Sequence, residues 1–380
     1  MTKLRVFVLF LTFLIVGVGG YFVSLLARGY RFDKANYKFS PNGILVAKSN
    51  PDGASVYIDG KLEGATNSNL RLAPKFYDIE IKKDGHLPWN KRISIKKEEV
   101  TQITAELFKT APSLSPVTFD GAINPVISPD MTKIAYISDK SLWVLSVSSL
   151  PIGFPNEPKK ITDNVDEQST YSFSPNSRQI LLETKTASYL LDASNFTHQS
   201  EKVNVENTKV KLLKLWNDEQ VALNEPKFRL VPSEISDVLK RKSSKFIFSP
   251  DENMVLYTAS SSARISEGLI PPLPGSSTQK EEREIKEGKT YVYDIKEDKN
   301  FLISDNNTPI YWLPSSRHLL NPTEEKIIIM DYDGTNKQTV FSGGYIFPFA
   351  FPYVNVSKLL ILTNLGSNSS ITNLYSLSIK

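Results

Sequence analysis

The sequence predicts a chain that is all-β apart from one N-terminal transmembrane helix, with a small β-sandwich followed by a six-bladed β-propeller. Three observations support this prediction. An apolar run without charges fills residues 6–27, apolar residues alternate between turns in residues 43–109, and a strand–turn–strand pattern recurs in residues 113–380. A chain of 380 residues has room for more than one domain, because most single domains hold about 100 to 200 residues.

The composition is that of a globular protein rich in turns. Apolar residues make up 40% of the chain and charged residues 23%, which is ordinary, and 23 prolines against 18 glycines favour many short elements. A formal net charge of +4 over this length is too small to indicate a nucleic-acid partner. The absence of cysteine excludes disulfides, thiolate nucleophiles and cysteine-based metal sites.

The apolar run from Val6 to Ala27 is long enough to cross a membrane. A bilayer core of about 30 Å needs roughly 20 helical residues, and this run has 22 residues without a charge. A cleaved signal peptide has a shorter apolar region of about 7 to 15 residues followed by small residues, whereas Arg28 follows this run directly. We therefore expect an uncleaved anchor at 6–27, with residues 1–5 as a tail and residues 28–42 as a linker.

The charges beside this run leave its orientation open. Two basic residues precede it, whereas Arg28, Arg31, Lys34 and Lys38 follow it with Asp33 among them, and a simple count places the following chain in the cytoplasm. The rule behind that count applies to short loops, because large folded domains are translocated largely regardless of flanking charge. A cytoplasm-facing scaffold is therefore one alternative.

Residues 43–109 carry the pattern of short strands. Apolar pairs two residues apart, such as Val56 with Ile58 and Ile79 with Ile81, indicate strands with one buried face. Between the strands lie the stretches PDG, DGK, NSN, KKDG and KKEE, in which Gly supplies positive φ and Asp or Asn caps its own turn. A compact antiparallel sandwich is expected.

This stretch resembles the PEGA domain, whose Pro-Glu-Gly-Ala signature appears here as PDGA at residues 51–54. The residues expected to form its structural turns are Pro51, Gly53, Ala54, Asp59, Gly60 and Gly64. The resemblance extends to Gly85 and implies a small all-β module of bacterial surface proteins, commonly tethered to membranes beside binding or propeller domains, without catalysis. Gly53 and Gly60 fit hairpin geometry better than a phosphate site, because no strand-to-helix step follows them.

Beyond Pro112 one pattern recurs, in which an apolar residue precedes a turn and then an apolar strand. Its copies are ISPDMTKIAYIS, FSPNSRQILLET, FSPDENMVLYTA, WLPSSRHLLNP, AFPYVNVSKLLILT and the degenerate KLWNDEQVALN. The turn residues are Pro129, Pro175, Asn217, Pro250, Pro314 and Pro352, spaced by 46, 42, 33, 64 and 38 residues. A four-stranded propeller blade repeats about every 40 to 50 residues. The long interval holds an insertion at 260–288, whose proline and charge content predicts a solvated segment between two strands of one blade.

The repeats resemble the TolB-like propeller family, also described as WD40-like repeats, in which a Ser-Pro-Asp-Gly turn precedes a Lys-Ile-Ala-Tyr type of strand. Pro129-Asp130 before KIAY is the best copy, Pro250-Asp251 is the next, and no copy keeps the glycine. The resemblance implies a rigid ring of blades. Residues 116–119 are expected to close that ring by adding a fourth strand to the last blade.

No catalytic, cofactor-binding or metal-binding residue is expected. His86, His198 and His318 fall in different units without acidic neighbours at metal-ligand spacing, and no nucleophile-elbow, Walker or Rossmann motif occurs. Asp130 and Asp251 most simply accept backbone N–H bonds in tight turns, with a ligand or Ca²⁺ contact as the alternative. The tryptophans and tyrosines of the repeats are expected to pack between blades, with a surface that stacks a glycan or peptide as the alternative.

The sequence thus predicts a non-enzymatic single-pass protein of the bacterial cell envelope, whose propeller is presented outside the cytoplasm on a PEGA-like stalk. Its membrane contact is residues 6–27, and its other partner is expected to be a protein or an envelope polymer rather than nucleic acid. The main alternative is a hydrolase or lyase in the propeller channel that acts on surface glycan or peptide. That alternative needs convergent carboxylates, but corresponding turn positions read Asp130, Asn176, Asp218, Asp251, Ser315 and Tyr353.

Overall fold

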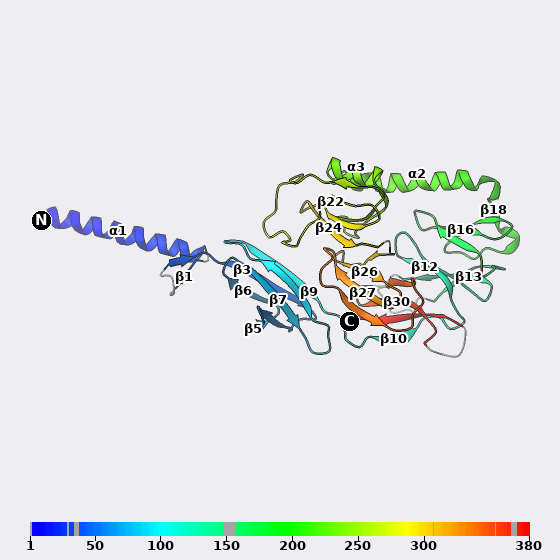
Figure 1. The fold of residues 1–380 in the computed structure, drawn as a ribbon, viewed down its shortest axis with the longest axis horizontal. Helices are drawn as coiled ribbons and strands as arrows, with labels where there is room; N and C mark the ends of the chain where they lie inside the picture. Colours follow the sequence, from blue (N-terminus) through cyan, green and yellow to red (C-terminus); the bar gives the residue numbers. More distant parts are fainter. Residues whose placement is uncertain are drawn as a thin grey trace. The chain divides into compact units, whose positions relative to one another are not determined.

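The chain divides into two compact units. The computed structural model describes residues 2–28, 30–33, 38–147, 157–306, 308–353, 355–365 and 371–380. The first unit comprises Met1–Leu107 with Pro272–Lys280, and the second comprises Phe108–Pro271 with Glu281–Lys380. Figure 1 follows the chain from the N-terminal helix (blue) to the last strands (red).

The N-terminal helix α1 spans Thr2–Ala27 and contains the whole apolar run. At 1.5 Å per residue, its 26 residues extend over about 39 Å, which exceeds the roughly 30 Å of a bilayer core. By length and composition it can cross a membrane, and its apolar stretch is not buried within the protein. Phe10 and Phe13, for example, are 67% and 73% exposed. Such a helix suits a membrane anchor or a signal sequence.

The expected linker contains a short hairpin. Strand β1 (Arg31–Asp33) pairs antiparallel with β2 (Lys38–Ser40). Residues 29 and 34–37, which include the charge of Lys34, lie outside the described residues.

Two sheets then form a small sandwich, with strand orders β6-β3-β9 and β5-β4-β7-β8. The strands are β3 (Gly43–Asn50), β4 (Ser55–Ile58), β5 (Lys61–Ala65), β6 (Ser68–Leu72), β7 (Phe76–Lys82), β8 (Trp89–Ser94) and β9 (Val100–Glu106). The prediction of an antiparallel sandwich is wrong for one pair, because β3 and β9 run parallel, with Ile44 opposite Val100. The chain crosses from β8 in the other sheet to β9, which then runs beside β3 in the same direction.

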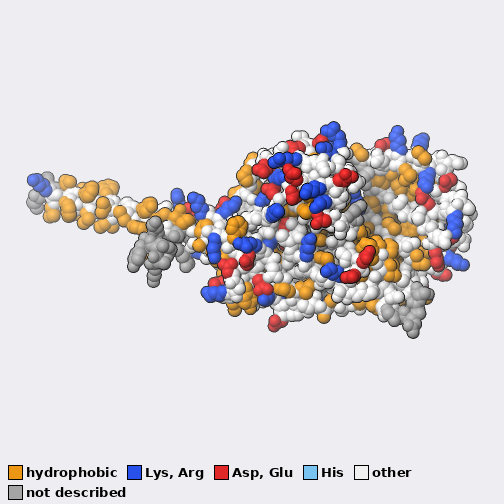
Figure 2. Space-filling model, viewed as in Figure 1, with side chains coloured by type: hydrophobic (Ala, Val, Ile, Leu, Met, Phe, Trp, Pro, Cys, Tyr) orange, Lys and Arg blue, Asp and Glu red, His pale blue; other side chains and the backbone are white. Residues whose placement is uncertain are grey.

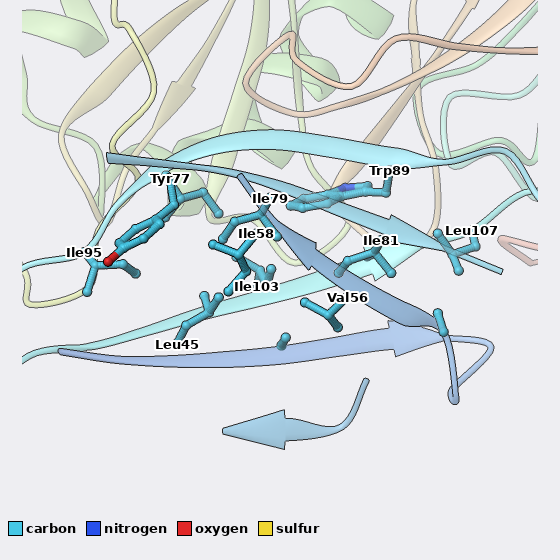
Figure 3. Close-up of a cluster of buried hydrophobic side chains, with 14 residues drawn as sticks. Leu45, Val56, Ile58, Tyr77, Ile79, Ile81, Trp89, Ile95, Ile103 and Leu107 are labelled. Atoms are coloured by element: carbon cyan, nitrogen blue, oxygen red, sulfur yellow. The ribbon is translucent and has the colours of Figure 1, made fainter. Parts of the chain in front are cut away.

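The core of the sandwich lies between the two sheets. Buried and exposed positions alternate along β3, β7 and β9, as the apolar pairs predict. Figure 3 shows Val56, Ile79 and Ile81 of one sheet in the same cluster as Leu45 and Ile103 of the other. Burying one such side chain contributes about 1.5 to 3 kcal/mol, so a cluster of this size can hold a small module together.

The segment Pro272–Lys280 belongs to the first unit, although it lies within the insertion expected between two blade strands. The N–H of Ser94 donates to Oγ1 of Thr278 at 3.1 Å, and Nε2 of Gln279 donates to the carbonyl of Arg92 at 2.6 Å. A Cβ on Gly275 would lie 2.8 Å from the carbonyl oxygen of Val100. This segment therefore contacts β8 and β9, and its residues are exposed or half-buried.

The second unit contains five four-stranded antiparallel sheets among the described residues. The first sheet consists of β11 (Ile123–Ile127), β12 (Lys133–Ser138), β13 (Ser141–Ser146) and β14 (Lys159–Asp163). The second consists of β15 (Thr170–Phe173), β16 (Gln179–Glu183), β17 (Ser188–Asp192) and β18 (Val203–Asn204). The third consists of β19 (Ser243–Phe248), β20 (Met254–Ala259), β23 (Thr290–Asp294) and β24 (Lys299–Ser304). The fourth consists of β25 (Tyr311–Trp312), β26 (His318–Pro322), β27 (Lys326–Asp331) and β28 (Gln338–Ser342).

The fifth sheet joins the two ends of this unit. It has the order β10-β31-β30-β29, made of β10 (Ser113–Pro116), β31 (Asn373–Ser378), β30 (Lys358–Thr363) and β29 (Ala350–Tyr353). Leu114 lies opposite Leu377. A strand from the beginning of the repeat region therefore completes the last sheet, slightly before the expected residues 116–119. Val354, within the last copy of the repeat, lies outside the described residues.

The expected sixth repeat is not a sheet. KLWNDEQVALN lies inside helix α2 (Lys209–Phe228), and a second helix, α3 (Ser233–Arg241), follows. Six blades are therefore not confirmed, and the expectation of an all-β chain beyond α1 is wrong. Leu212 and Trp216, four residues apart, place one stripe of α2 against Leu181 and Val205 of the second sheet, which is helical rather than strand periodicity.

Neighbouring sheets pack face to face. Ile134 and Tyr136 of the first sheet share a cluster with Leu360 of the last sheet, and other apolar clusters join the first sheet to the second and the third to the fourth. The insertion between β20 and β23 adds the two-stranded pair β21 (Ala263–Arg264) and β22 (Glu284–Ile285). The described part of this unit is thus a series of stacked four-stranded antiparallel sheets.

Candidate functional site

The turns between the first and second strands of three sheets share one hydrogen-bonding pattern. Oγ of Ser128 donates to Oδ1 of Asp130 at 2.6 Å and accepts the N–H of Lys133 at 2.9 Å. Ser174 with Asn176 and Ser249 with Asp251 repeat the carboxylate or amide contact at 2.8 and 2.6 Å. Each serine thereby joins the turn to the strand that follows it.

These turns are also linked from one element to the next. The N–H of Asp130 donates to Oγ of Ser177 at 3.3 Å, and the N–H of Asp251 donates to Oγ of Ser316 at 2.9 Å. Asn176 donates instead to Glu219 of α2 at 2.6 Å. Pro129, Pro175 and Pro250 thus stand in a linked series of turns rather than in isolated loops.

Ser177 and Ser316 occupy the position of the glycine in the family turn. Their φ angles are +59° and +58°, and Met131 and Glu252 have +57° and +59° at the same position. This left-handed region favours glycine. The two serines gain a hydrogen bond in exchange, because their hydroxyls accept the N–H of the neighbouring turn.

The carboxylates of the turns are held in their ionised form. Partial burial raises the pKa of Asp130, but hydrogen bonds from Ser128, Thr132 and Ser177 outweigh it, so the pKa lies below its usual value. The pKa of Asp251 is lowered in the same balance of burial against hydrogen bonds from its turn. A carboxylate with a lowered pKa is a poor proton donor at neutral pH, so these two residues fit a structural role.

A buried histidine brings a serine and a carboxylate together in the fourth sheet. His318 is 4% exposed, its Nδ1 lies 3.0 Å from Oγ of Ser315, and its Nε2 lies 3.7 Å from Oδ1 of Asp331. Asp331 lies directly opposite His318 across the β26–β27 pair, so this histidine has an acidic neighbour that is distant along the chain. The ring of Phe108 meets His318 edge-on at 6.0 Å.

Within the part of the chain that the structure describes, the other two histidines have different contacts. Nδ1 of His86 lies 2.8 Å from the carbonyl oxygen of Asp84, and His198 meets the ring of Phe196 edge-on at 4.8 Å. Within the described residues, no three His, Cys, Asp or Glu side chains gather as a metal ion requires.

The signature residues of the first unit form its turns. Gly53 and Gly60 have φ of +68° and +80°, where a side chain is strained. Ala54 is fully buried, and its N–H donates to Oγ1 of Thr66 at 2.9 Å. Asp59 accepts the N–H of Asp78 at 3.0 Å, which fixes the hairpin that ends near Gly64. The turn beginning at Pro51 is therefore hydrogen-bonded to the backbone and side chain of Thr66.

The model of the PEGA domain family matches residues 42–111. Residues 42–111 are a PEGA domain. The match covers the sandwich with all seven of its strands, so the PEGA domain and the two facing sheets coincide. No match is found among curated proteins.

Solved structures similar to the chain include two TolB proteins. The putative TolB of Agrobacterium tumefaciens is 13% identical over 66% of this chain and 76% of its own, with a TM-score of 0.24. TolB of Acinetobacter baumannii is 13% identical over 80% of this chain and 59% of its own, with a TM-score of 0.25. Hsv2 of Kluyveromyces lactis is 10% identical over 65% of this chain and 71% of its own, with a TM-score of 0.24.

The aromatic residues beyond the PEGA domain are mostly buried between elements. Trp312 is 1% exposed and donates from Nε1 to the carbonyl of Ile247 at 3.1 Å, and Tyr257 stacks on Tyr291 at 5.6 Å. Trp143 is half-buried beneath Lys160, whose Nζ lies 5.5 Å from the ring. Figure 2 shows basic and acidic side chains interspersed over the visible face beyond α1, without a field of one sign.

Proposed function

We propose that the protein is a single-pass membrane protein of the bacterial cell envelope, which holds its PEGA domain and its five-sheet unit outside the cytoplasm to bind a protein or an envelope polymer. The observation that carries this proposal is the succession of α1, whose apolar stretch is not buried within the described part of the protein, and a PEGA domain beginning at residue 42. The 14 or so residues between them reach at most about 50 Å when extended. A domain on such a tether acts close to the membrane surface.

Topology tests this proposal, and the absence of cysteine makes the test clean. Lys61→Cys places a thiol on an 80% exposed side chain of the PEGA domain, and Lys3→Cys places one before the apolar run. A membrane-impermeant maleimide on intact cells or spheroplasts should label only the first variant. Labelling of Lys3→Cys alone would establish the cytoplasmic scaffold instead.

The intact mass of the membrane-extracted protein tests the anchor separately. Retention of residues 6–27 and resistance to alkaline extraction are expected for an anchor. A mature protein that begins beyond Arg28 and washes off the membrane would identify α1 as a signal sequence and contradict the single-pass proposal.

Binding is tested with the full chain in detergent, because the loops of a rigid β-scaffold are the natural place for recognition. Cell-wall polymer isolated from the same bacterium should retain the chain if the partner is a polymer, and in-cell photocrosslinking should give a discrete adduct if it is a protein. An absence of both would count against a binding role.

A hydrolase is the second candidate, and the contact among Ser315, His318 and Asp331 is the observation that favours it. In a Ser-His-Asp set the imidazole takes the serine proton at one nitrogen while a carboxylate orients the other. Here Ser315 is half-buried and His318 is buried, so substrate access is restricted. A fluorophosphonate reagent should label the full chain, and Ser315→Ala should abolish the label, if the set is catalytic. Without labelling, the set is structural.

A further inference from the structure

One side of helix α2 packs against the second unit, to which the helix itself belongs. Leu212 and Trp216 pack on the second sheet. The charges beside them are also paired, since Lys209 contacts Glu183, and Lys227 lies 3.1 Å from Glu252. This inner side of α2 is therefore held by apolar contacts and ion pairs within the second unit.

The side of α2 next to this inner side, turned by roughly 100° from Trp216, exposes large apolar side chains. Val210 is 84% exposed, Leu213 42% and Val221 58%. Spaced by three and four residues with Asn217 between them, these positions follow one line along the helix. Exposed apolar side chains gathered along one line, with charged residues beside them, mark an interaction site.

The charges that flank this line divide by sign. Lys211 and Lys214 lie in the first half of the helix, and Asp218 and Glu225 lie in the second half on the same flank. Among the described residues, Lys211, Lys214 and Asp218 form no ion pair, and Glu225 has a contact of 3.6 Å with Lys240 at the surface. Exposed pairs of that kind contribute little, about 0 to 1 kcal/mol.

We propose that this face of α2 binds the same face of a second copy of the chain, with the two helices antiparallel. The sign pattern is complementary to itself only in that direction, because a parallel copy would bring like charges together. A two-fold axis beside Asn217 sets Leu213 of one copy opposite Val221 of the other. The same axis places the lysines of each copy beside the acidic residues of the other copy, as an isologous interface requires. This proposal does not depend on the anchoring proposed above, because its residues lie on α2 alone.

Cross-linking of the full chain tests the geometry. Asn217→Cys introduces the single thiol of the molecule at the proposed axis, so a short bis-maleimide should join two copies efficiently in detergent or in native membranes. Thr339→Cys, at an exposed position of β28, is the matched control and should give at least tenfold less dimer. Equal yields from the two variants would overturn the proposal.

Charge reversal tests whether the partner of this face of α2 is a second copy of the chain. In the Asn217→Cys background, Lys211→Glu with Lys214→Glu should lower the dimer yield about tenfold, and Asp218→Lys with Glu225→Lys should do the same. Mixing these two proteins should restore cross-linking as a heterodimer, because each then supplies the sign that the other lacks. All four changes in one chain should restore the homodimer. Recovery excludes misfolding as the cause of the loss, and a failure of both recoveries would show that the occupant is not a second copy.

Discussion

The backbone N–H of Asp251 donates a 2.9 Å hydrogen bond to Oγ of Ser316, which lies in the corresponding turn of the next four-stranded sheet. The same bond joins Asp130 to Ser177 between the first and second sheets. The accepting serine sits at positive φ in both cases. A hydroxyl therefore replaces the glycine of this turn and ties one sheet to the next.

Ser316→Ala should destabilise the second unit by about 1 kcal/mol, because the N–H of Asp251 loses its acceptor. Urea unfolding of the full chain followed by tryptophan fluorescence measures this change. Ser194→Ala, at an exposed position of another turn, is the control and should have little effect. Equal stability of Ser316→Ala and the parent would show that the bond between the turns carries no energy.

Glu252→Gly should stabilise the chain by about 0.5 to 1 kcal/mol, because it removes a left-handed side chain at a cost of about 1 to 2 kcal/mol while adding the flexibility of glycine to the unfolded state. Its exposed ion pair with Lys227 is a minor loss. The urea midpoint measures the effect. Glu325→Gly, in an exposed bend without positive φ, should instead be neutral or destabilising, and stabilisation by both would refute the strain argument.

Asp130→Asn should weaken the dependence of stability on acid. Because the folded pKa of Asp130 is lowered, its contribution is fully present above the unfolded pKa of about 3.9 and is lost as the pH falls through the folded pKa. Asn176 accepts the same contacts in the second sheet, so the substituted turn can keep its shape. Unfolding free energies at about pH 7 and at two values below about pH 4 test this, with Glu167→Gln as an exposed control. An unchanged acid slope would contradict it.

Gly43→Ala should destabilise the PEGA domain by about 1 to 3 kcal/mol, because the interior is already filled. A Cβ there would meet the carbonyl oxygen of Lys96 and lie 2.5 Å from Cγ2 of Ile95. Gly60→Asn is the matched control, since Gly60 has open space and asparagine tolerates its φ of +80°. Thermal unfolding should separate the two variants, and a similar loss in both would show that crowding at Gly43 is not the cause.

The strands of the PEGA domain and the Ser-Pro-Asp turns could be predicted because their signals are local. The alternation of Val56 and Ile58 predicts a single strand, and Asp130 predicts the turn in which it lies. The parallel pairing of Ile44 with Val100 could not be predicted, because it depends on how the chain crosses between sheets.

The helix α2 could not be predicted from the repeat pattern, because part of its sequence resembles a degenerate copy of the repeat. Trp216 and Val221 can be placed on a strand by eye, yet residues 209–225 contain neither glycine nor proline and are rich in leucine and lysine, which favour a helix. The contact of His318 with Asp331 was also missed, since spacing along the chain hides a pair that lies opposite across a hairpin. Counting strand register from the turn at residues 323–325, between β26 and β27, reveals the pair.

The pairing of β10 with β31 constrains the order in which the second unit can be made. During synthesis β10 leaves the ribosome long before β31, so it must wait with an unsatisfied edge while the intervening sheets assemble. If this unit crosses a membrane before β31 pairs with β10, the chain crosses unfolded. A premature stop codon that removes β31 would leave the edges of both β10 and β30 unpaired and open to association with other chains.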